Sequence, residues 1–254
     1  MKKEKKFEDV FIISLIIPII LIVLWQIAAN NGAINIQLFP SPLKIWQAFV
    51  KSVETGKLQA NILTSLERVL IGYIYGAVLG VAIGVIFGLS KKTYRLFSFL
   101  LEILRPIPII AWVPVLIMIF GIGELSKIIV IVIGSFWSIF LNTYDGIRNV
   151  DDKYLEVANM FRKKKMEVVL RVMLPAALPG IFTGLRIGIG SAWISVIGAE
   201  LIASSAGLGY MISYSREMTQ PANMYVSVFI IGIIGYLINA VLKLIENKAL
   251  RWNS

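Results

Sequence analysis

The side chains that most often carry out bond chemistry are missing from this sequence. None of its 254 residues is a cysteine and none is a histidine. A Ser-His-Asp triad, an imidazole proton shuttle and a metal site built on thiolates are therefore excluded. No carboxylate pair stands at an obvious catalytic spacing, and no Gly-x4-Gly-Lys-Ser/Thr loop is present to hold nucleotide phosphates. A membrane enzyme is consequently the least favoured functional class.

Arg186 and Glu200 are charged residues inside a long apolar stretch, where a charge is expensive. Their separation of 14 residues gives nearly the same helix face but ~21 Å along the axis, so they cannot pair with each other. Arg186 is expected either to bind a carbonyl or carboxylate of a neighbouring helix or to face an aqueous path. Glu200 is expected close to the outer membrane interface, where its cost is lower.

The composition is that of an integral membrane protein. Hydrophobic residues make up 57% of the chain and charged residues 16%, and the mean hydropathy is +0.80. Soluble domains have ~45–50% apolar and ~25% charged residues. A membrane-spanning helix needs ~20 mostly apolar residues. The sequence therefore predicts an all-α fold with six spans, over residues 10–29, 66–89, 97–120, 128–147, 176–202 and 224–245.

Basic residues indicate the orientation of these spans. The first apolar run follows four lysines within residues 1–6 and is longer than the ~7–15 apolar residues of a signal peptide, so a retained helix is expected. Lysine and arginine also gather in residues 91–95, in residues 148–171 and at the C-terminus. Because such residues favour the cytoplasmic side, both termini are predicted to be cytoplasmic. The net charge of +10 is interpreted as this bias, not as a nucleic-acid-binding surface.

Glycines recur at every fourth position of the second and fifth predicted spans. Residues four apart form one slowly drifting stripe on a helix, and stripes of small residues let helix backbones approach closely in lipid. Two compatible interpretations follow: tight helix packing, and a surface along which helices slide. The glycines are Gly72, Gly76, Gly80, Gly84 and Gly88 in the second span, and Gly180, Gly184 and Gly188 in the fifth.

Prolines interrupt the third predicted span. Each proline removes a backbone hydrogen bond and kinks the helix, and broken helices at membrane depth are tolerated where they are buried in protein or line a cavity. The segment is either a pore lining or a plain kinked helix. The candidates for an aqueous path across the membrane are Pro106, Pro108, Trp112, Arg186, Trp193 and Glu200.

The predicted cytoplasmic loop over residues 151–175 has a structure of its own. Leu155, Ala158 and Phe161 recur at helical spacing, and apolar residues recur again after residue 167, with charges between them. This pattern predicts a pair of amphipathic helices joined near Arg162, outside the bilayer. The pair either lies on anionic lipid or docks a cytoplasmic partner.

This loop resembles the cytoplasmic motif of permease subunits of bacterial ABC importers, in which Glu-Ala-Ala, three residues, Gly and nine residues precede Ile-x-Leu-Pro. The matching positions are Glu156, Ala158, Val172 in place of Ile, Leu174 and Pro175. Val157 and Arg162 depart from the pattern, and Arg162 cannot adopt the positive φ that Gly allows cheaply. The order and spacing of further segments resemble the nitrate/sulfonate/taurine importer permeases over nearly the whole chain: residues 105–108, 112–114, 121–124, 175–179, 183–186, 199–200 and 207–209.

The resemblance implies a type I importer permease (MetI-like) fold and a set of partners. It implies one transmembrane domain over residues 1–254, with a core of about five spans in residues 60–250 and a coupling loop in residues 151–175. Two permease copies would associate with two ATPase subunits and an external solute-binding protein in a bacterial cytoplasmic membrane. ATP and Mg would be bound by the ATPase, with no cofactor in this chain. The coupling residues would be Glu156, Ala158, Arg162, Leu174 and Pro175.

An autonomous ion-coupled carrier or channel is the alternative. Such proteins usually need acidic groups at membrane depth, and the predicted spans offer little beyond Glu200, with Glu102 and Asp145 near the span ends. The transported solute is not readable from the sequence. The related permeases are associated with nitrate, taurine, alkanesulfonates and thiamine-type precursors.

Overall fold

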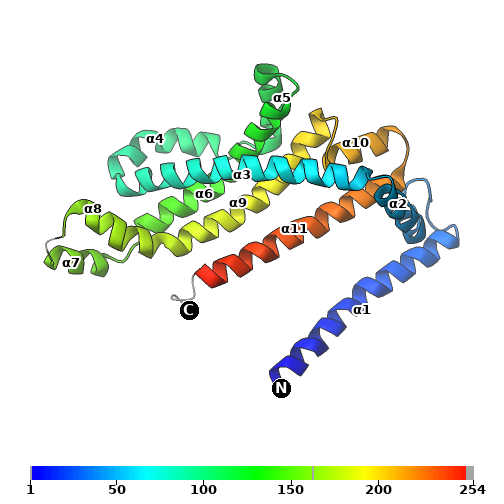
Figure 1. Cartoon of the computed structure of the whole chain (residues 1–254), viewed down its shortest axis with the longest axis horizontal. Coiled ribbons are helices and arrows are strands. Elements are labelled where there is room, and N and C mark those ends of the chain that lie inside the picture. Colours follow the sequence, from blue (N-terminus) through cyan, green and yellow to red (C-terminus); the bar gives the residue numbers. More distant parts are fainter. Residues whose placement is uncertain (1, 162, 250–254) are drawn as a thin grey trace. The chain divides into compact units, whose positions relative to one another are not determined.

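The computed structural model describes residues 2–161 and 163–249, and helices make up nearly all of that part of the chain (Figure 1). The predicted all-α fold is confirmed, since no strand occurs among these residues. The helices are α1 (Lys2–Asn30), α2 (Pro42–Glu54), α3 (Lys57–Leu89), α4 (Lys91–Leu104), α5 (Ile109–Phe120), α6 (Glu124–Arg148), α7 (Asp152–Met160), α8 (Lys165–Val168), a π-helical turn (Val169–Met173), α9 (Leu174–Ala203), α10 (Leu208–Glu217) and α11 (Pro221–Ala249).

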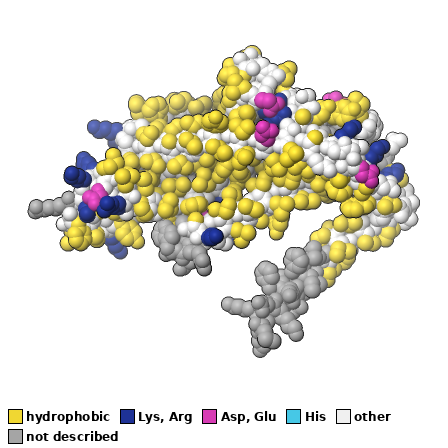
Figure 2. All heavy atoms as spheres, viewed as in Figure 1, with side chains coloured by type: hydrophobic (Ala, Val, Ile, Leu, Met, Phe, Trp, Pro, Cys, Tyr) yellow, Lys and Arg dark blue, Asp and Glu magenta, His cyan; other side chains and the backbone are white. Residues whose placement is uncertain are grey.

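Four described helical stretches are long and apolar enough to cross a membrane. They are α3, α6, the stretch Lys165–Glu217 that contains α9, and α11. Hydrophobic side chains cover most of the face over α3 and α4 in Figure 2, as expected where lipid tails replace water. The bent pair of α4 and α5 would add a fifth span. The count of six, which includes α1, stays a prediction.

The third predicted span is not one helix. α4 and α5 meet at an angle of 95° with the break at residues 105–108. Pro106 and Pro108 have no N–H to continue the hydrogen-bond ladder. Arg105 is still helical (φ −59°, ψ −44°), whereas Pro108 is extended (φ −58°, ψ 133°), so the helix ends between them. The expected kink is therefore a full change of direction.

The chain forms two compact units. The first comprises residues 1–60 and 211–230, where Ser41 caps α2 by accepting a hydrogen bond from the Lys44 N–H at 3.3 Å. The ring of Tyr225 lies 5.9 Å from that of Trp25 within the same unit. The second unit comprises residues 61–210 and 231–254 and contains both sites described below. One transmembrane domain over the whole chain stays a prediction.

A glycine seam joins α3 to α6 in the second unit. The side chains that face the glycines also recur at every fourth position: Ile131 faces Gly72, Ser135 faces Gly76, Ile139 faces Gly80, Thr143 faces Gly84 and Ile147 faces Gly88. Because the residue numbers rise together, the two helices run parallel. A methyl group added at Gly80 would lie 2.9 Å from the Ile139 Cβ and 3.2 Å from the Phe136 carbonyl oxygen. Only glycine lets the helices approach this closely.

The second glycine stripe packs α9 against α6. Gly180 lies against Gly146, and Gly188 lies against Ile139, so the residue numbers run in opposite directions and the helices are antiparallel. A Cβ at Gly180 would come within 3.0 Å of the Gly146 Cα. α3 and α9 also contact each other directly, since the Tyr73 hydroxyl donates to a carbonyl oxygen of α9 at 3.0 Å. The predicted glycines thus lie in the helix–helix contacts of a core made of α3, α6 and α9, with the α7–α8 loop at one end and the N-terminus of α6 at the other.

Candidate functional site

The α7 helix and the residue that follows it, Phe161, carry exposed apolar side chains. The side chains of Met160 and Phe161 are 83% and 73% exposed, and Tyr154 and Val157 are exposed as well. Charged residues precede and follow this cluster in the chain. An exposed apolar group of this kind marks an interaction surface. The expected amphipathic loop is present, with α7 and α8 as its helices, and Arg162 between them lies outside the described residues.

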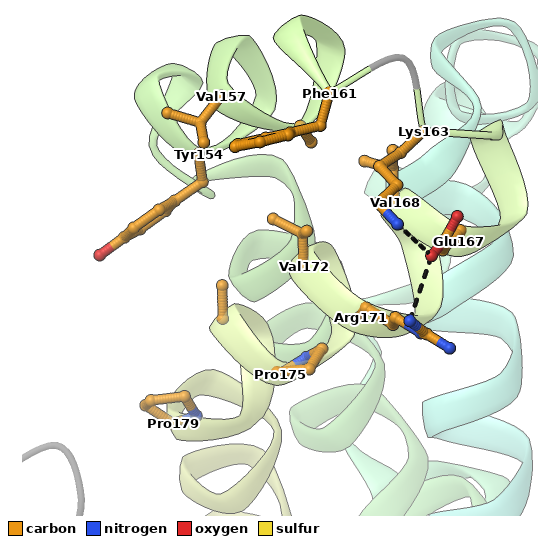
Figure 3. Close-up of a pocket in the computed structure, with 12 residues that line it drawn as sticks. Tyr154, Val157, Phe161, Lys163, Glu167, Val168, Arg171, Val172, Pro175 and Pro179 are labelled. Carbon is orange, nitrogen blue, oxygen red and sulfur yellow. Dashed lines mark hydrogen bonds and ion pairs between the residues drawn. The ribbon is translucent and has the colours of Figure 1, made fainter.

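A groove of about 830 Å³ separates α7 from the helical stretch that leads into α9 (Figure 3). Tyr154, Val157 and Phe161 line one wall of the groove. Val172 and Pro175 line the other wall. At the rim, the Glu167 carboxylate pairs with Lys163 at 2.8 Å and with Arg171 at 3.1 Å. The groove is apolar within and charged at the rim, a composition suited to another protein's side chain.

The predicted coupling residues differ in their surroundings. Ala158 is buried and lines the groove together with Pro175, while Glu156 on the same helix is exposed. Leu174 is half-buried and packs against the cluster of Ile147, Ala177 and Ile181 in the second unit. Pro175 is the second residue of α9, where the helical backbone continues from the π-helical turn Val169–Met173, so its missing N–H falls inside a helical stretch. The structure therefore brings Ala158 and Pro175 together and leaves Glu156 outside the groove.

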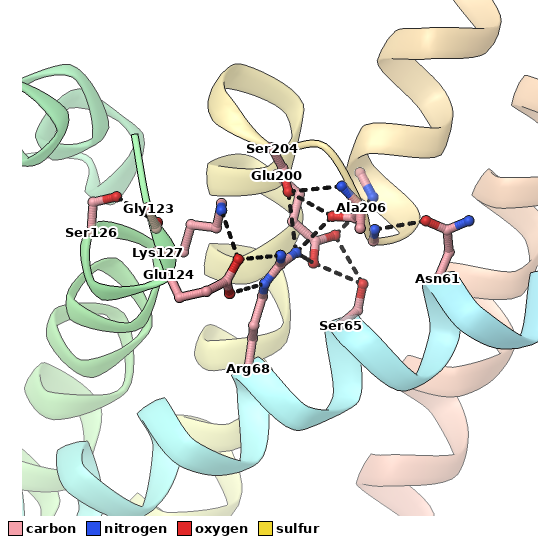
Figure 4. A network of polar contacts seen from close by, with 12 residues as sticks. Asn61, Ser65, Arg68, Gly123, Glu124, Ser126, Lys127, Glu200, Ser204 and Ala206 are labelled. Atoms are coloured by element: carbon pink, nitrogen blue, oxygen red, sulfur yellow. Dashed lines mark hydrogen bonds and ion pairs between the residues drawn. The ribbon is translucent and has the colours of Figure 1, made fainter. Parts of the chain in front are cut away.

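Arg68 is the centre of a second cluster, at the opposite end of α9 (Figure 4). Its guanidinium donates to the Glu124 carboxylate at 2.6 and 2.7 Å and to Glu200 at 2.8 Å. It also donates to the Ala206 carbonyl oxygen at 2.6 Å. Lys127 pairs with Glu124 at 3.0 Å. Two cations and two carboxylates balance, so a net-neutral group ties α3 to α6 and α9.

Glu200 is the buried part of this cluster, with 1% of its surface exposed. Its carboxylate accepts hydrogen bonds from the Ser65 hydroxyl and from the Gly209 N–H, each at 2.9 Å, in addition to Arg68. Gly207 follows at φ +112°, where a side chain would be strained and would strike the Glu200 carboxylate. The turn between α9 and α10 is thus held onto the carboxylate by the backbone and by Arg68.

Protein groups hold the buried Glu200 carboxylate. Its expected position close to the outer membrane interface stays a prediction. Sequence reasoning missed Arg68, which stands two residues inside the second predicted span. A cation inside an apolar span predicts a nearby carboxylate. That signal could have marked Arg68 as a residue with a carboxylate partner, without naming the partner.

Arg186 has a carboxylate partner on a neighbouring helix. Its guanidinium lies 2.8 Å from a carboxylate oxygen of Glu246 on α11, within the second unit. Arg186 and Glu200 do not pair with each other, as the helix geometry predicted. Of the two alternatives for Arg186, the structure shows the paired one, although 34% of its side chain is exposed.

The remaining candidates for an aqueous path lie in separate environments. Trp193 is buried and donates its indole N–H to the Ile231 carbonyl oxygen at 3.1 Å. Trp112 is half-buried against Val113 and its neighbours in a core cluster. Pro106 and Pro108 are exposed at the break between α4 and α5. The structure therefore does not assemble the six candidates into one lining.

Neither cluster has the make-up of a catalytic or metal centre. Among the described residues, no group of three or more acidic side chains lies where it could hold a metal ion. The carboxylates of the second cluster are neutralised by Arg68 and Lys127. Long apolar helices, a charge-balanced cluster and an exposed apolar loop are together typical of a multi-pass membrane protein.

Comparison with known sequences shows the family. Residues 76–248 match the binding-protein-dependent transport system inner membrane component family, so the chain belongs to that family. A Bacillus subtilis protein whose name assigns it to aliphatic sulfonates transport as a permease is 36% identical, over 95% of this chain and 87% of its own length. The nitrate import permease protein NrtB of Synechocystis is 32% identical, over 90% and 85%. The chain is accordingly an ABC importer permease of the inner membrane, and not an enzyme.

Solved structures show the same fold. The permease chain of the inward-facing MetNI methionine ABC transporter is similar with a TM-score of 0.68 and 21% identity, over 77% of this chain and 97% of that one. An amino acid ABC transporter is similar with a TM-score of 0.64 and 19% identity, over 79% and 98%. The predicted MetI-like permease fold is confirmed.

Proposed function

We propose that this permease couples to cytoplasmic ATPase subunits through residues 151–175 and carries a solute delivered by an external binding protein. The observation that carries the proposal is the exposed apolar face of α7 beside the groove. A segment rich in lysine and arginine is expected to lie in water, where exposed apolar side chains are unfavourable. We therefore expect a partner protein to bury this surface. α9 extends from the groove to the Arg68 cluster, so a movement imposed on Pro175 reaches both ends of the core.

The assembly consists of two permease copies, two ATPase subunits and the binding protein. The second copy is an identical chain that completes the translocation path. ATP and Mg are bound by the ATPase, since this sequence has no phosphate-binding loop. Both termini and the α7–α8 loop lie in the cytoplasm, because lysine and arginine gather there.

The transported solute is a small molecule, and the names of relatives indicate its chemical class. Named relatives transport aliphatic sulfonates, nitrate and bicarbonate. A nitrate-, sulfonate- or taurine-like anion, or a thiamine-precursor-like compound, fits this range. An ion-coupled carrier is less well supported, because the Glu200 carboxylate is held by Arg68 and Ser65 and is not available for a coupling ion.

Acidic substitutions on α7 test the coupling surface. We expect Val157→Asp and Phe161→Asp to abolish co-purification of the ATPase encoded with this permease, because a charge would have to be buried in the interface without a partner. The matched control is Leu43→Asp on α2, since Leu43 and Val157 are 57% and 52% exposed. The control is expected to retain the ATPase.

The measurement is the ratio of ATPase to permease in detergent-purified complexes, with the permease yield recorded for each variant. Full retention of the ATPase by both α7 variants at normal permease yield would contradict the proposal. Loss of the ATPase in the Leu43→Asp control as well would show a general failure of assembly, and would remove the support that the α7 variants give.

A further inference from the structure

The α2 helix carries three different faces along its 13 residues. The first is an apolar stripe with the i, i+3, i+7, i+10 spacing of one helix face, made of Leu43, Trp46, Val50 and Val53. The second is a polar stripe about 100° further round the helix, made of Lys44, Gln47, Lys51 and Glu54. The third holds the two buried residues of the helix, Ile45 and Ser52. A helix between protein and water needs only two faces, so α2 meets one further environment.

The protein leaves the apolar stripe of α2 uncovered. Leu43, Trp46 and Val53 are exposed, and the Phe49 ring lies 5.3 Å from the Trp46 ring beside the stripe. Tryptophan is enriched where a membrane meets water, because its ring is apolar and its N–H is polar. Thirteen residues extend ~20 Å, which is too short to cross a hydrocarbon core of ~30 Å. This length and pattern are typical of a helix that lies along a membrane surface.

A hydrogen bond places the start of α2 beside the end of α1. The Leu43 N–H donates to the side-chain carbonyl oxygen of Gln26 at 3.1 Å, and Gln26 lies one turn before the last residue of α1, Asn30. Residues 16–24 of α1 are all apolar and exposed, without a polar face. An uncovered helix that is apolar all round is typical of a membrane span. The polar residues Gln26 and Asn30 then mark the edge of the hydrocarbon, and α2 begins at that edge.

The polar stripe of α2 fits phospholipid headgroups. Lys44 and Lys51 are exposed and lie beside the apolar stripe. A lysine in this position keeps its methylene groups against apolar surface and extends its ammonium toward water and lipid phosphate. A soluble binding protein would approach from the water side, where α2 presents its polar stripe. The geometry therefore favours lipid over protein as the cover of the apolar stripe.

We propose that α2 is a lipid-binding helix that lies in the outer membrane–water interface. Its apolar stripe contacts the acyl chains of outer-leaflet phospholipid, and its lysines face the phosphate groups. The helix thereby holds the outer end of α1 at a fixed depth in the bilayer. This surface precedes residues 76–248, the part of the chain that matches the family. The inference includes α1 as a span and the proposed orientation, and it does not depend on the solute or on the ATPase.

The absence of native cysteines lets one position be labelled at a time. Val53→Cys on the apolar stripe and Glu54→Cys on the polar stripe form a matched pair at the far end of α2, since both side chains are exposed. Each full-length variant is labelled with an NBD fluorophore in nanodiscs of phosphatidylcholine and phosphatidylglycerol. Quenching is measured with phosphatidylcholine that is spin-labelled on the upper acyl chain, and separately with aqueous iodide. We expect lipid quenching to be several-fold stronger at residue 53, and iodide quenching to be several-fold stronger at residue 54.

Two further labels calibrate the measurement. Ile20→Cys, exposed on α1, gives the quenching of a side chain in the hydrocarbon. Leu43→Cys, at the start of the stripe, is expected to be quenched by lipid as strongly as Val53→Cys. If Val53→Cys gives no assembled permease, Val50→Cys replaces it, because Val50 belongs to the same stripe.

Three results would overturn the inference. Equal lipid quenching at residues 53 and 54 would show that the apolar stripe does not face the bilayer. Lipid quenching at residue 43 without quenching at residue 53 would show that α2 leaves the membrane surface. An unquenched label at residue 20 would show that α1 is not a span. Each of these results leaves the coupling to the ATPase untouched, since that coupling is measured by co-purification.

The external binding protein is the other occupant that the test examines. Its addition at saturating concentration is expected to leave lipid quenching at residue 53 unchanged. A label at residue 53 that escapes lipid quenching and changes its fluorescence when the binding protein is added would assign the stripe to that protein instead.

Discussion

The two ends of α9 invert the usual distribution of polar and apolar groups in opposite ways. At Glu200, three of the four charged side chains are buried, Glu124 is the exposed fourth, and every charge has a partner within 3.0 Å. At Pro175, apolar side chains of the neighbouring α7 are exposed, and the charges at the groove rim face water. Buried charges of one chain bind one another and fix structure. The first end therefore fixes the fold, and the second is the surface that we propose binds the ATPase.

Removal of Arg68 should produce the largest effect on stability. Arg68→Met leaves the Glu200 carboxylate buried without its cation, and breaking a buried ion pair in this way costs about 3–5 kcal/mol. Thermal unfolding of the purified permease in detergent measures the loss. Val157→Asp at the other end, on an exposed surface, should change the unfolding free energy by less than about 0.5 kcal/mol.

The double variant Arg68→Met/Glu200→Gln sharpens this result. It removes both charges, so it should be more stable than Arg68→Met alone, and the difference measures the coupling between the two residues. A double variant that is less stable than Arg68→Met would show that the stability of the Arg68 cluster does not depend on the pairing of these two charges.

The seam that connects the two ends should come second in effect. Gly80→Ala places a methyl group against the Ile139 side chain and the Phe136 carbonyl oxygen, and overpacking of this kind costs about 1–3 kcal/mol. Gly232→Ala is the matched control, because nothing lies within 4 Å of its added methyl group. The control should be neutral or more stable by up to about 1 kcal/mol, since alanine favours helix. Equal melting temperatures for the two variants would argue against a tight α3–α6 seam.

Periodicity made the seam predictable. Glycine at every fourth position from Gly72 to Gly88 marks a helix face, and the structure shows Ile131 to Ile147 facing it with the same spacing. The proline signal was also local: it predicted an interrupted third span, and the break lies at Pro106 and Pro108, while Pro114 stands inside α5. The 95° angle was not predictable, because it depends on what the two helices pack against.

The partners of the charged residues could not be predicted from local patterns. Arg68 and Glu200 are separated by 132 positions and meet only because α3 and α9 converge. Glu124 contacts Arg68 from the first turn of α6. An acidic residue is common in the first turn of any helix, so its sequence position does not indicate an ion pair. Such sites are products of packing, whereas the α7–α8 loop is encoded within one continuous segment.

A charge change at the docking end should have the smallest effect. Glu167→Gln removes the ion pairs with Lys163 and Arg171, whose side chains are 46% and 76% exposed. Exposed pairs are worth about 0–1 kcal/mol and are screened by salt. We therefore expect a small loss of thermal stability that disappears in about 1 M salt, where the Debye length is about 3 Å. A salt-independent loss of thermal stability comparable to that of Arg68→Met would mean that the ion pairs at the groove rim fix the fold as the Arg68 cluster does. The contrast between the two ends of α9 would then be wrong.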